Sequence, residues 1–455
     1  MIEKRTKIIC TIADNRCDAD FIRQLYENGM NVVRINSAHA SIEGAQQVVD
    51  NVRKVSDKIA ILIDTKGPEV RLTQMADSVG FVARTGETVE IIDDPSGLCR
   101  KGVLVGSDIL IDDGSVDLSV TDKCEGKLIC KVMNEGLIKG HKSVNVPNVH
   151  INLPAVTEKD RRFIQWAIKA DIDFIAHSFV RSAKDLQEIQ SILDAENSHL
   201  KIISKIENQQ GVDNLDEILS YCYGVMVARG DLGVEIPAER IPLIQRDIVK
   251  ACRSRKKPVI IATQMLQSMI DNPRPTRAEV TDVANAIFQS SDAIMLSGES
   301  AFGKYPIEAV KTMTKIALQT EQTIEVNLDL NLRKVVKPVA VVLAQSLVAA
   351  TQELPVKALI FDTYTGRVGR YLSTFRPSVP LYAMCYNDYT MRELGLVFGV
   401  KTYKFYKVKD KEEFAAKSIE ILSKEGYIKP GDLVGFIGGV FGAQVGATYM
   451  ELKYV

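Results

Sequence analysis

Two acidic residues stand at the ends of apolar runs that are close together in the sequence. Glu207 ends the run "KIISKIE", which also contains Lys205, and Asp231 ends the run "GVMVARGD". Carboxylate oxygens are ligands that Mg²⁺ prefers, and the ion completes its coordination with water and substrate oxygens. Each acid could instead cap the helix that follows it. Because a lysine and a "GDLG" turn accompany the pair, we favour a metal site and predict that Glu207 and Asp231 bind Mg²⁺ or Mn²⁺.

Polar residues also stand at or just after the ends of the neighbouring apolar runs. They are Arg34, Asn36, His39, Asp64, Thr65, Lys66, Glu69, Arg71, Ser178, Arg181, Arg229, Gly230, Thr263, Gln264, Ser297, Glu299 and Ser300. Cations and carboxylates gathered in one place suit a phosphorylated substrate that is held through a metal. Lys205, Arg34 and Arg71 could neutralise the charge of a phosphoryl group in transfer. Lys205 could equally be a structural partner of the acids, and a single arginine is more often a solvated surface residue.

Some of these residues have a purely structural explanation. Thr276 and Glu279 in "TRAE" form a capping box at the start of a helix. His39 and His141 belong to a residue type that is more often exposed and polar than catalytic. Gly230 would allow a ligand to approach the backbone, but such a glycine alone usually marks a turn.

Eight short apolar runs rich in β-branched residues must position these side chains. They begin at Lys7, Val32, Ile59, Asp173, Lys201, Gly224, Pro258 and Asp292. Runs that are apolar on both faces are typical of buried parallel strands. Longer segments between them, such as 18–29 and 238–257, have helical spacing. Eight units of a strand and a helix predict a (β/α)₈ barrel, in which the carboxyl ends of the strands meet at one mouth.

Two stretches interrupt or follow this pattern. About 100 residues separate the third run from the fourth, and residues 71–146 contain turn signals and short alternating strands. We predict that this insertion is a small β-barrel domain that acts as a lid over the barrel mouth. After residue 332 helices and strands alternate again, which predicts a doubly wound α/β domain. The predicted domains are residues 1–70 with 147–332, residues 71–146 and residues 333–455.

Composition limits the classes of function. The chain has 455 residues, of which 46% are hydrophobic, and its formal net charge of -1 gives no general attraction to nucleic acid or to an anionic membrane. No apolar run approaches the roughly 20 residues of a membrane span, and the first residues lack the apolar core of a signal peptide. We therefore expect a cytoplasmic protein. Eight scattered cysteines without a C-x-x-C pair indicate reduced thiols, and five histidines without paired spacing argue against zinc.

Several stretches together resemble the pyruvate kinase family. They are "RTKIICTI", "GMNVVRIN", "DTKGPEVR", "SKIEN", "MVARGDLGVEIP", "ATQMLQSM", "NPRPTRAEVTDVANAI" and "SGESAFGKYP", and they occur in order across nearly the whole predicted barrel. The resemblance implies a barrel with an inserted lid, a C-terminal regulatory domain and a homotetramer. It also implies the glycolytic transfer of a phosphoryl group from phosphoenolpyruvate to ADP, giving pyruvate and ATP, with Mg²⁺ and K⁺ as cofactors.

The resemblance also implies roles for individual residues. The catalytic residues would be Lys205, Thr263, Arg34 and Arg71. Substrate contacts are expected from Arg34, Ser178, Lys205, Gly230, Asp231 and Thr263, and nucleotide contacts from Asn36, His39, Arg71 and Lys142. The divalent metal would be bound by Glu207 and Asp231, and K⁺ by Asn36, Asp64 and Thr65.

The chain departs from the family pattern in places. Ala38 in "NSAH" replaces a serine hydroxyl expected at the K⁺ site, while Glu69 is the residue that accompanies K⁺ dependence, so we expect dependence with weakened affinity. The insertion, at about 75 residues, is shorter than usual. Val368 in "TYTGRVG" and the loop "GGVFGAQVGA" at 438–447 differ from the family's effector site. We expect a small-molecule effector of unknown identity at the C-terminal domain, and no activation by fructose bisphosphate.

Two other functions would use many of the same features. A metal-dependent lyase or aldolase acting on a pyruvate enolate would need the acids and the metal, but not the lid or the cations of "DTKGPEVR". A binding protein without activity would be expected to lack Lys205 or one of the acids, and all of these residues are present.

Overall fold

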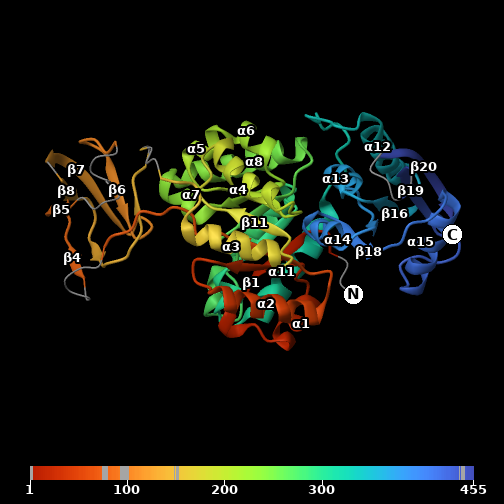
Figure 1. Ribbon diagram of the computed structural model, residues 1–455, viewed down its shortest axis with the longest axis horizontal. Coiled ribbons are helices and arrows are strands. Elements are labelled where there is room, and N and C mark those ends of the chain that lie inside the picture. The colour runs from red at the N-terminus through yellow and green to blue at the C-terminus, as the bar shows by residue number, and fades with distance from the viewer. Residues whose placement is uncertain are drawn as a thin grey trace.

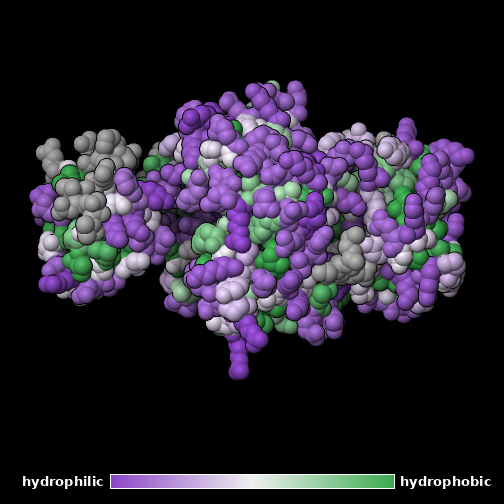
Figure 2. Space-filling model, turned by 90° about the horizontal axis from the view of Figure 1, so that it is seen from below, coloured by the Kyte–Doolittle hydropathy of each residue, from purple (hydrophilic) through white to green (hydrophobic). Residues whose placement is uncertain are grey.

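The computed structural model describes residues 4–73, 80–92, 102–124, 126–147, 149, 153–439, 441 and 446–455. Figure 1 shows three bodies in a row, with a β-rich insertion at one end, a barrel in the middle and an α/β domain at the other end. Seen from below, hydrophilic residues predominate on the surface, and hydrophobic ones lie among them (Figure 2). No helix in the described ranges is both long enough and apolar enough to cross a membrane.

Eight parallel strands form a closed barrel in the order β1, β15, β14, β13, β12, β11, β3 and β2. Their bounds are β1 (Lys7–Thr11), β2 (Val32–Asn36), β3 (Ala60–Asp64), β11 (Phe174–His177), β12 (Lys201–Ile206), β13 (Gly224–Ala228), β14 (Val259–Ala262) and β15 (Ala293–Leu296). Nearly all residues of these strands are buried, which is why each strand is a continuous apolar run in the sequence. The predicted barrel is confirmed.

Helices connect the barrel strands and cover the outside of the barrel (Figure 1). They are α1 (Ala19–Glu27), α2 (Ile42–Val55), α3 (Glu158–Lys169), α4 (Ala183–Ala195), α5 (Gln209–Asp213), α6 (Leu215–Tyr221), α7 (Arg229–Glu235), α8 (Ile241–Ser254), α9 (Arg277–Phe288), α10 (Gly298–Ala301) and α11 (Pro306–Thr320), with short 3₁₀ segments η1 (Asp14–Arg16), η2 (Ala238–Arg240), η3 (Gln267–Ile270) and η4 (Glu321–Thr323). At the start of α9, Thr276 and Glu279 form the predicted capping box.

The register of the strands aligns their ends at the mouth. Asn36 at the end of β2 lies opposite Asp64 at the end of β3, and Lys205 of β12 lies opposite Met226 of β13. Met226 packs inside the barrel with Ile203. Because side chains alternate along a strand, Lys205, two residues after Ile203, points to the same inner side. The apolar filling of the barrel therefore ends at a layer of charged side chains.

The insertion between β3 and α3 consists of antiparallel strands. They are β4 (Phe81–Ala83), β5 (Thr88–Ile92), β6 (Asp108–Ile111), β7 (Val116–Cys124), β8 (Lys127–Val132), β9 (Gly136–Ile138) and β10 (Val144–Asn145). Five of them form a sheet in the order β10, β6, β7, β8 and β5, and β4 pairs with β9. Residues from both sheets share one apolar core. Two chain segments that pair at Arg71 and Ser143 join the insertion to the barrel.

The C-terminal domain is a five-stranded sheet in the order β18, β17, β16, β19 and β20, parallel except for the edge strand β20. Its elements are α12 (Pro338–Glu353), β16 (Val356–Thr363), α13 (Arg367–Thr374), β17 (Leu381–Cys385), α14 (Asp388–Glu393), η5 (Leu394–Leu396), β18 (Val400–Lys404), α15 (Lys411–Lys424), β19 (Leu433–Gly439) and β20 (Ala447–Tyr454). Alternate residues of β16 and β17 pack on α12 and α13 or, on the other face, on α15. The doubly wound fold is confirmed, while the predicted domain boundaries stay predictions.

Candidate active site

Lys205 is at the centre of the charged layer at the barrel mouth. Its Nζ lies 2.9 Å from Glu207 Oε1 and 3.1 Å from Asp64 Oδ1. The same ammonium donates a hydrogen bond of 2.8 Å to Ser178 Oγ. Burial alone would lower the pKa of Lys205, but the carboxylates of Asp64 and Glu207 outweigh it and raise the pKa above its ordinary value. The site therefore holds a fixed, protonated ammonium.

Arg34 and Asp64 form a second ion pair beside this lysine. Arg34 Nε lies 2.7 Å from Asp64 Oδ2, and Arg34 Nη1 donates to Thr11 Oγ1 at 2.9 Å. Burial would raise the pKa of Asp64, but Lys205 and Arg34 outweigh it and lower the pKa. Asp64 is thus ionised and orients two cations at once.

Ser178 ties the lysine to the backbone of the neighbouring strand end. Its hydroxyl donates to the carbonyl oxygen of Thr65 at 2.7 Å and accepts from Lys205. Its backbone amide donates to Thr65 Oγ1 at 3.0 Å. Since Ser178 is 2% exposed, these contacts fix the direction of the ammonium from the side away from solvent.

Glu207 and Asp231 are brought together, as predicted from the sequence. Glu207 is 1% exposed, and its Oε2 accepts a 2.7 Å hydrogen bond from the amide of Phe179. Burial, with Asp231 nearby, raises the pKa of Glu207 to about 7 although Lys205 opposes the shift. Burial also raises the pKa of Asp231. No lysine or arginine of the described chain forms an ion pair with Asp231.

This pair of acids has the donor chemistry that a hard cation requires. Burial raises the pKa of both carboxylates, and Asp231 raises that of Glu207 further, so a divalent ion would be favoured in place of a proton. In the described residues no group of three or more His, Cys, Asp and Glu side chains could hold a metal. An ion at Glu207 and Asp231 would therefore complete its coordination with water and substrate oxygens, as Mg²⁺ usually does in proteins.

Thr263 and Gly230 form the far side of the mouth. The amide of Gly230 donates to Thr263 Oγ1 at 2.8 Å, and Arg229 Nη2 donates to the carbonyl oxygen of Thr263 at 2.8 Å. Thr263 has a φ of 69°, which is unfavourable for a β-branched residue and is typical of functional sites. A Cβ on Gly230 would meet Thr263 only at 3.6 Å, so the protein's own packing does not require glycine there.

A cavity of about 250 Å³ opens between the mouth and the insertion. Asp231, Phe179 and Asn208 line it from the barrel, and Arg71 and Asp113 line it from the insertion. Space for a ligand therefore lies beside Asp231 and between the two bodies.

The structure does not bring every predicted residue to this centre. Arg71 donates to Glu69 at 2.8 Å and to the carbonyl oxygen of His141 at 2.9 Å. Lys142 forms a 2.9 Å ion pair with Asp112 inside the insertion, and His39 is exposed. Within the described part of the chain, no hydrogen bond or ion pair joins these three cationic or polar side chains to Lys205.

The K⁺ residues predicted by resemblance lie at neighbouring strand ends. Asn36 is opposite Asp64, and Asn36 Oδ1 accepts a 3.1 Å hydrogen bond from the amide of Ala38. Thr65 Oγ1 donates to the carbonyl oxygen of Ala176 at 3.3 Å. These residues are therefore brought together by the pairing of β2 with β3, and their oxygens are partly engaged in hydrogen bonds within the protein.

Sequence reasoning missed two residues of the site. Thr11, which accepts the hydrogen bond from Arg34, ends β1 and could have been found by the strand-end rule that found the others. Phe179 contributes its backbone amide to Glu207 at a φ of 55°. No sequence signal marks an apolar residue whose backbone, and not its side chain, does the binding.

Comparisons with known proteins give a consistent result. Residues 3–310 match the family model described as pyruvate kinase, barrel domain, and residues 342–450 match that described as pyruvate kinase, alpha/beta domain. The pyruvate kinase of Borreliella burgdorferi is 45% identical over 100% of this chain and 98% of its own length, and that of Geobacillus stearothermophilus is 43% identical over 100% and 81%. The crystal structure of a pyruvate kinase from Cryptosporidium parvum superposes with a TM-score of 0.92 at 34% identity, covering 99% of this chain and 96% of that one.

Proposed function

Because the chain belongs to the pyruvate kinase family and is thus a phosphotransferase, we propose that it transfers the phosphoryl group of phosphoenolpyruvate to ADP, giving pyruvate and ATP in glycolysis. The observation that carries this proposal is the protonated Lys205 held between Asp64 and Glu207, with Asp231 beside them. An enzyme catalyses phosphoryl transfer mainly by positioning the reactants and by stabilising negative charge with cations. The fixed ammonium of Lys205 can contribute to both.

Glu207 and Asp231 would hold Mg²⁺ or Mn²⁺. The raised pKa of both carboxylates, which favours a bound cation or proton, supports this assignment. When bound, such an ion would neutralise negative charge on the substrate and on the group being transferred. The pair cannot satisfy a whole coordination shell, so the ion would bind together with the substrate.

Other side chains of the mouth would bind the substrate and stabilise the transition state. Lys205 and Arg34 would face the phosphoryl group, where a fixed cation stabilises charge that develops in the transition state. Ser178 would keep the ammonium of Lys205 in place, which is supported by its 2.8 Å hydrogen bond. Thr263 and the backbone at Gly230 would bind the substrate carboxylate. Because no side chain of the described residues lies close to Gly230 on its Cβ side, a ligand could approach its backbone closely.

Nucleotide and K⁺ would bind toward the insertion. His39, Asn36, Arg71 and Lys142 are the proposed nucleotide contacts, and the last two would reach the mouth when the insertion closes on its hinge segments at Arg71 and Ser143. Asn36, Asp64 and Thr65 are the proposed K⁺ ligands. Because Ala38 supplies no hydroxyl and its amide already occupies Asn36 Oδ1, we expect K⁺ to be required but weakly bound.

A coupled assay of ATP formation from phosphoenolpyruvate and ADP with Mg²⁺ tests the proposal. We expect activity in the parent that rises with K⁺, and a fall of about a thousandfold or more in kcat for Lys205→Met. Lys184→Met, which changes an exposed lysine of α4, serves as the control and should stay within about twofold of the parent. No ATP from the folded parent would refute the proposal and favour a lyase or a binding protein. Equal activity without K⁺ would refute the K⁺ requirement.

A homotetramer is the proposed assembly. Val339 and Val342 on α12 are 61% and 58% exposed, and Met450 and Leu452 on the edge strand β20 are 43% and 39% exposed. Apolar residues grouped in this way are typical of interaction surfaces, which supports contact between subunits at the C-terminal domain. Sedimentation equilibrium should give the mass of four chains, and the mass of one chain would refute the assembly.

The stretch "TYTGRVG" at 363–369, where the family has its effector site, does not identify the effector. Thr363 Oγ1 accepts a 2.8 Å hydrogen bond from the amide of Gly366, and Val368 is 7% exposed. In the loop at 438–447, residues 440 and 442–445 lie outside the described residues. We keep the proposal of an effector of unknown identity without activation by fructose bisphosphate, and a change in substrate cooperativity on adding that ligand would contradict it.

A further inference from the structure

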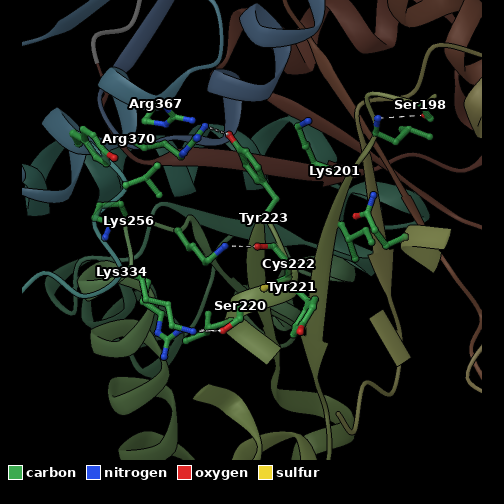
Figure 3. A pocket seen from close by; sticks show the side chains of 18 residues that line it. Ser198, Lys201, Ser220, Tyr221, Cys222, Tyr223, Lys256, Lys334, Arg367 and Arg370 are labelled. Atoms are coloured by element: carbon green, nitrogen blue, oxygen red, sulfur yellow. Dashed lines mark hydrogen bonds between the residues drawn. The ribbon is translucent and has the colours of Figure 1, made fainter. Parts of the chain in front are cut away.

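A second cavity, of about 650 Å³, lies between the barrel and the C-terminal domain (Figure 3). Residues just before β12, β13 and β14 form its barrel wall, and residues at the start of α13 form the opposite wall. Glu207 and Asp231 stand at the other ends of these strands, and a six-residue strand such as β12 spans roughly 17 Å. The cavity, which we call the interdomain cleft, is therefore separate from the candidate active site.

The interdomain cleft is strongly basic. Seven of the side chains that line it are Lys or Arg, and none of the described lining residues is Asp or Glu. The whole chain has a formal net charge of -1, so this is a local concentration of charge and not a property of the composition.

Two of the seven cations are balanced by acids outside the lining. Lys201 Nζ lies 3.4 Å from Glu393, and Arg255 forms an ion pair with Asp216. These two ion pairs are sufficient to explain why Lys201 and Arg255 stand at the interface. They leave five cations to be explained.

The other cations form no ion pair with a described residue, and their hydrogen-bond acceptors are neutral. Lys256 donates to the carbonyl oxygen of Arg333, Lys257 donates to that of Cys222, and Lys334 donates to Ser220 Oγ at 2.6 Å. An ammonium carries three donors, so each of these lysines retains donors beyond the bond that is made.

The same holds for the cations nearest the C-terminal domain. Arg370 Nη1 lies 3.4 Å from the hydroxyl of Tyr223, and its guanidinium stacks over the Tyr223 ring at 5.1 Å. Arg367 forms no ion pair with any described residue. Figure 3 shows Arg367, Arg370, Lys256 and Lys334 around the space beside Tyr223.

The crowding of these cations is unfavourable in the protein alone. Burial, with Lys257 and Arg255 nearby, lowers the pKa of Lys256 to about 8, and burial also lowers the pKa of Lys257. A bound anion would remove this penalty, because it would supply the negative charge that the lining lacks.

We propose that the interdomain cleft binds a small organic phosphate with at least two phosphate groups, held by Lys256, Lys334 and Arg370. Lysine and arginine donors are suited to phosphate oxygens, and an arginine binds them through two parallel hydrogen bonds. A volume of about 650 Å³ is in the range of small-molecule sites and exceeds what one phosphate ion fills. The organic part would contact Tyr221, which also lines the cleft and is 48% exposed. Because the two walls come from different domains, the ligand would also stabilise their arrangement.

Calorimetric titration of the full chain with inorganic triphosphate, without Mg²⁺, tests the site. The double variant Lys334→Gln, Arg370→Gln removes two cations that form no ion pair with a described residue. It leaves Arg367 intact because Arg367 also lines a small pocket beside the turn at 363–366. The matched control, Lys424→Gln, Lys429→Gln, removes the same charge from exposed positions at the far side of the C-terminal domain. We expect affinity at least about tenfold weaker in the cleft variant and within about twofold in the control.

Hydrogen exchange locates the bound probe. Triphosphate should protect peptides that cover residues 219–223 and 254–258 in the parent and not in the cleft variant. Protection confined to the barrel mouth or to the turn at 363–366, or equal affinity in all three proteins, would overturn the proposal. If the double variant does not fold, Lys334→Glu at a single exposed position should weaken binding in the same direction, and unchanged affinity there would also overturn it.

Discussion

At the carboxyl ends of the barrel strands Lys205 lies 2.9 Å from Glu207 and 3.1 Å from Asp64, whereas at the amino ends Lys256 meets only a carbonyl oxygen of Arg333. Both lysines are 8% exposed. Nevertheless the pKa of Lys205 is raised, while the pKa of Lys256 is lowered to about 8. At the same exposed fraction, Asp64 and Glu207 raise the pKa of Lys205, whereas burial and the neighbouring Lys257 and Arg255 lower that of Lys256.

The difference shows how the two ends could serve different ligands. The mouth contains its own counterions, and a cation and a phosphorylated substrate can enter it together without leaving unbalanced charge. Five of the seven cations that line the interdomain cleft form no ion pair with a described residue, so a bound anion would balance them. The predictions below test this contrast.

The largest effect is expected from replacing each lysine by methionine. Lys205→Met would leave Glu207 buried without a cation and Asp64 with Arg34 alone, and we expect a loss of about 3 to 5 kcal/mol in the free energy of unfolding. Lys256→Met removes an ammonium without an acidic partner and should change it by less than about 1 kcal/mol. Urea denaturation of both variants and the parent measures this.

The two variants are matched, because each replaces a lysine of equal exposure by the same apolar side chain. Equal losses in the two variants would mean that burial, and not the partner, determines the contribution of each lysine. The contrast between the two ends of the barrel would then be wrong.

Much of the fold and part of the site could be predicted from the sequence. Buried parallel strands are continuous apolar runs, so eight of them separated by helical segments identify a barrel, and the strand-end rule then gathers Lys205, Glu207 and Asp231 at one mouth. The strained backbone of Thr263 and the amide of Phe179 could not be predicted, because backbone conformation here depends on tertiary packing. The interdomain cleft was also out of reach, since its cations come from separate segments that only the docking of the two domains brings together.

A third arrangement, a partly buried acid that forms no ion pair with a described residue, extends the contrast. Asp362 of β16 accepts a 3.1 Å hydrogen bond from the hydroxyl of Tyr386, and burial raises its pKa from 3.8 to about 6. The folded state therefore keeps this proton to a higher pH than the unfolded state. Stability is lost as the pH rises from about 4 to about 6, by about 3 kcal/mol in total.

Asp362→Asn should remove this loss. We expect the variant to be more stable than the parent by up to about 3 kcal/mol at pH 8 and to match it near pH 4, where Asp362 is protonated. Asp388→Asn, at an exposed position paired with Lys404, is the control and should show no such gain at pH 8. Urea midpoints at both pH values measure the difference, and a variant that is no more stable at pH 8 would show that Asp362 is not destabilising when ionised.

The smallest effect concerns how firmly the mouth holds its lysine. Ser178 Oγ accepts from Lys205 and donates to the carbonyl oxygen of Thr65, so Ser178→Ala would leave one ammonium donor free while both ion pairs remain. We expect kcat to fall about tenfold with little change in KM. A less firmly held Lys205 would stabilise the transition state less well, while substrate binding would stay nearly the same. Ser204→Ala is the matched control: Ser204 is equally buried on β12, and its hydroxyl has no hydrogen-bond partner among the described residues. If both alanine variants lowered kcat alike, or if Ser178→Ala raised only KM, Ser178 would be a packing residue and the ion pairs alone would position Lys205.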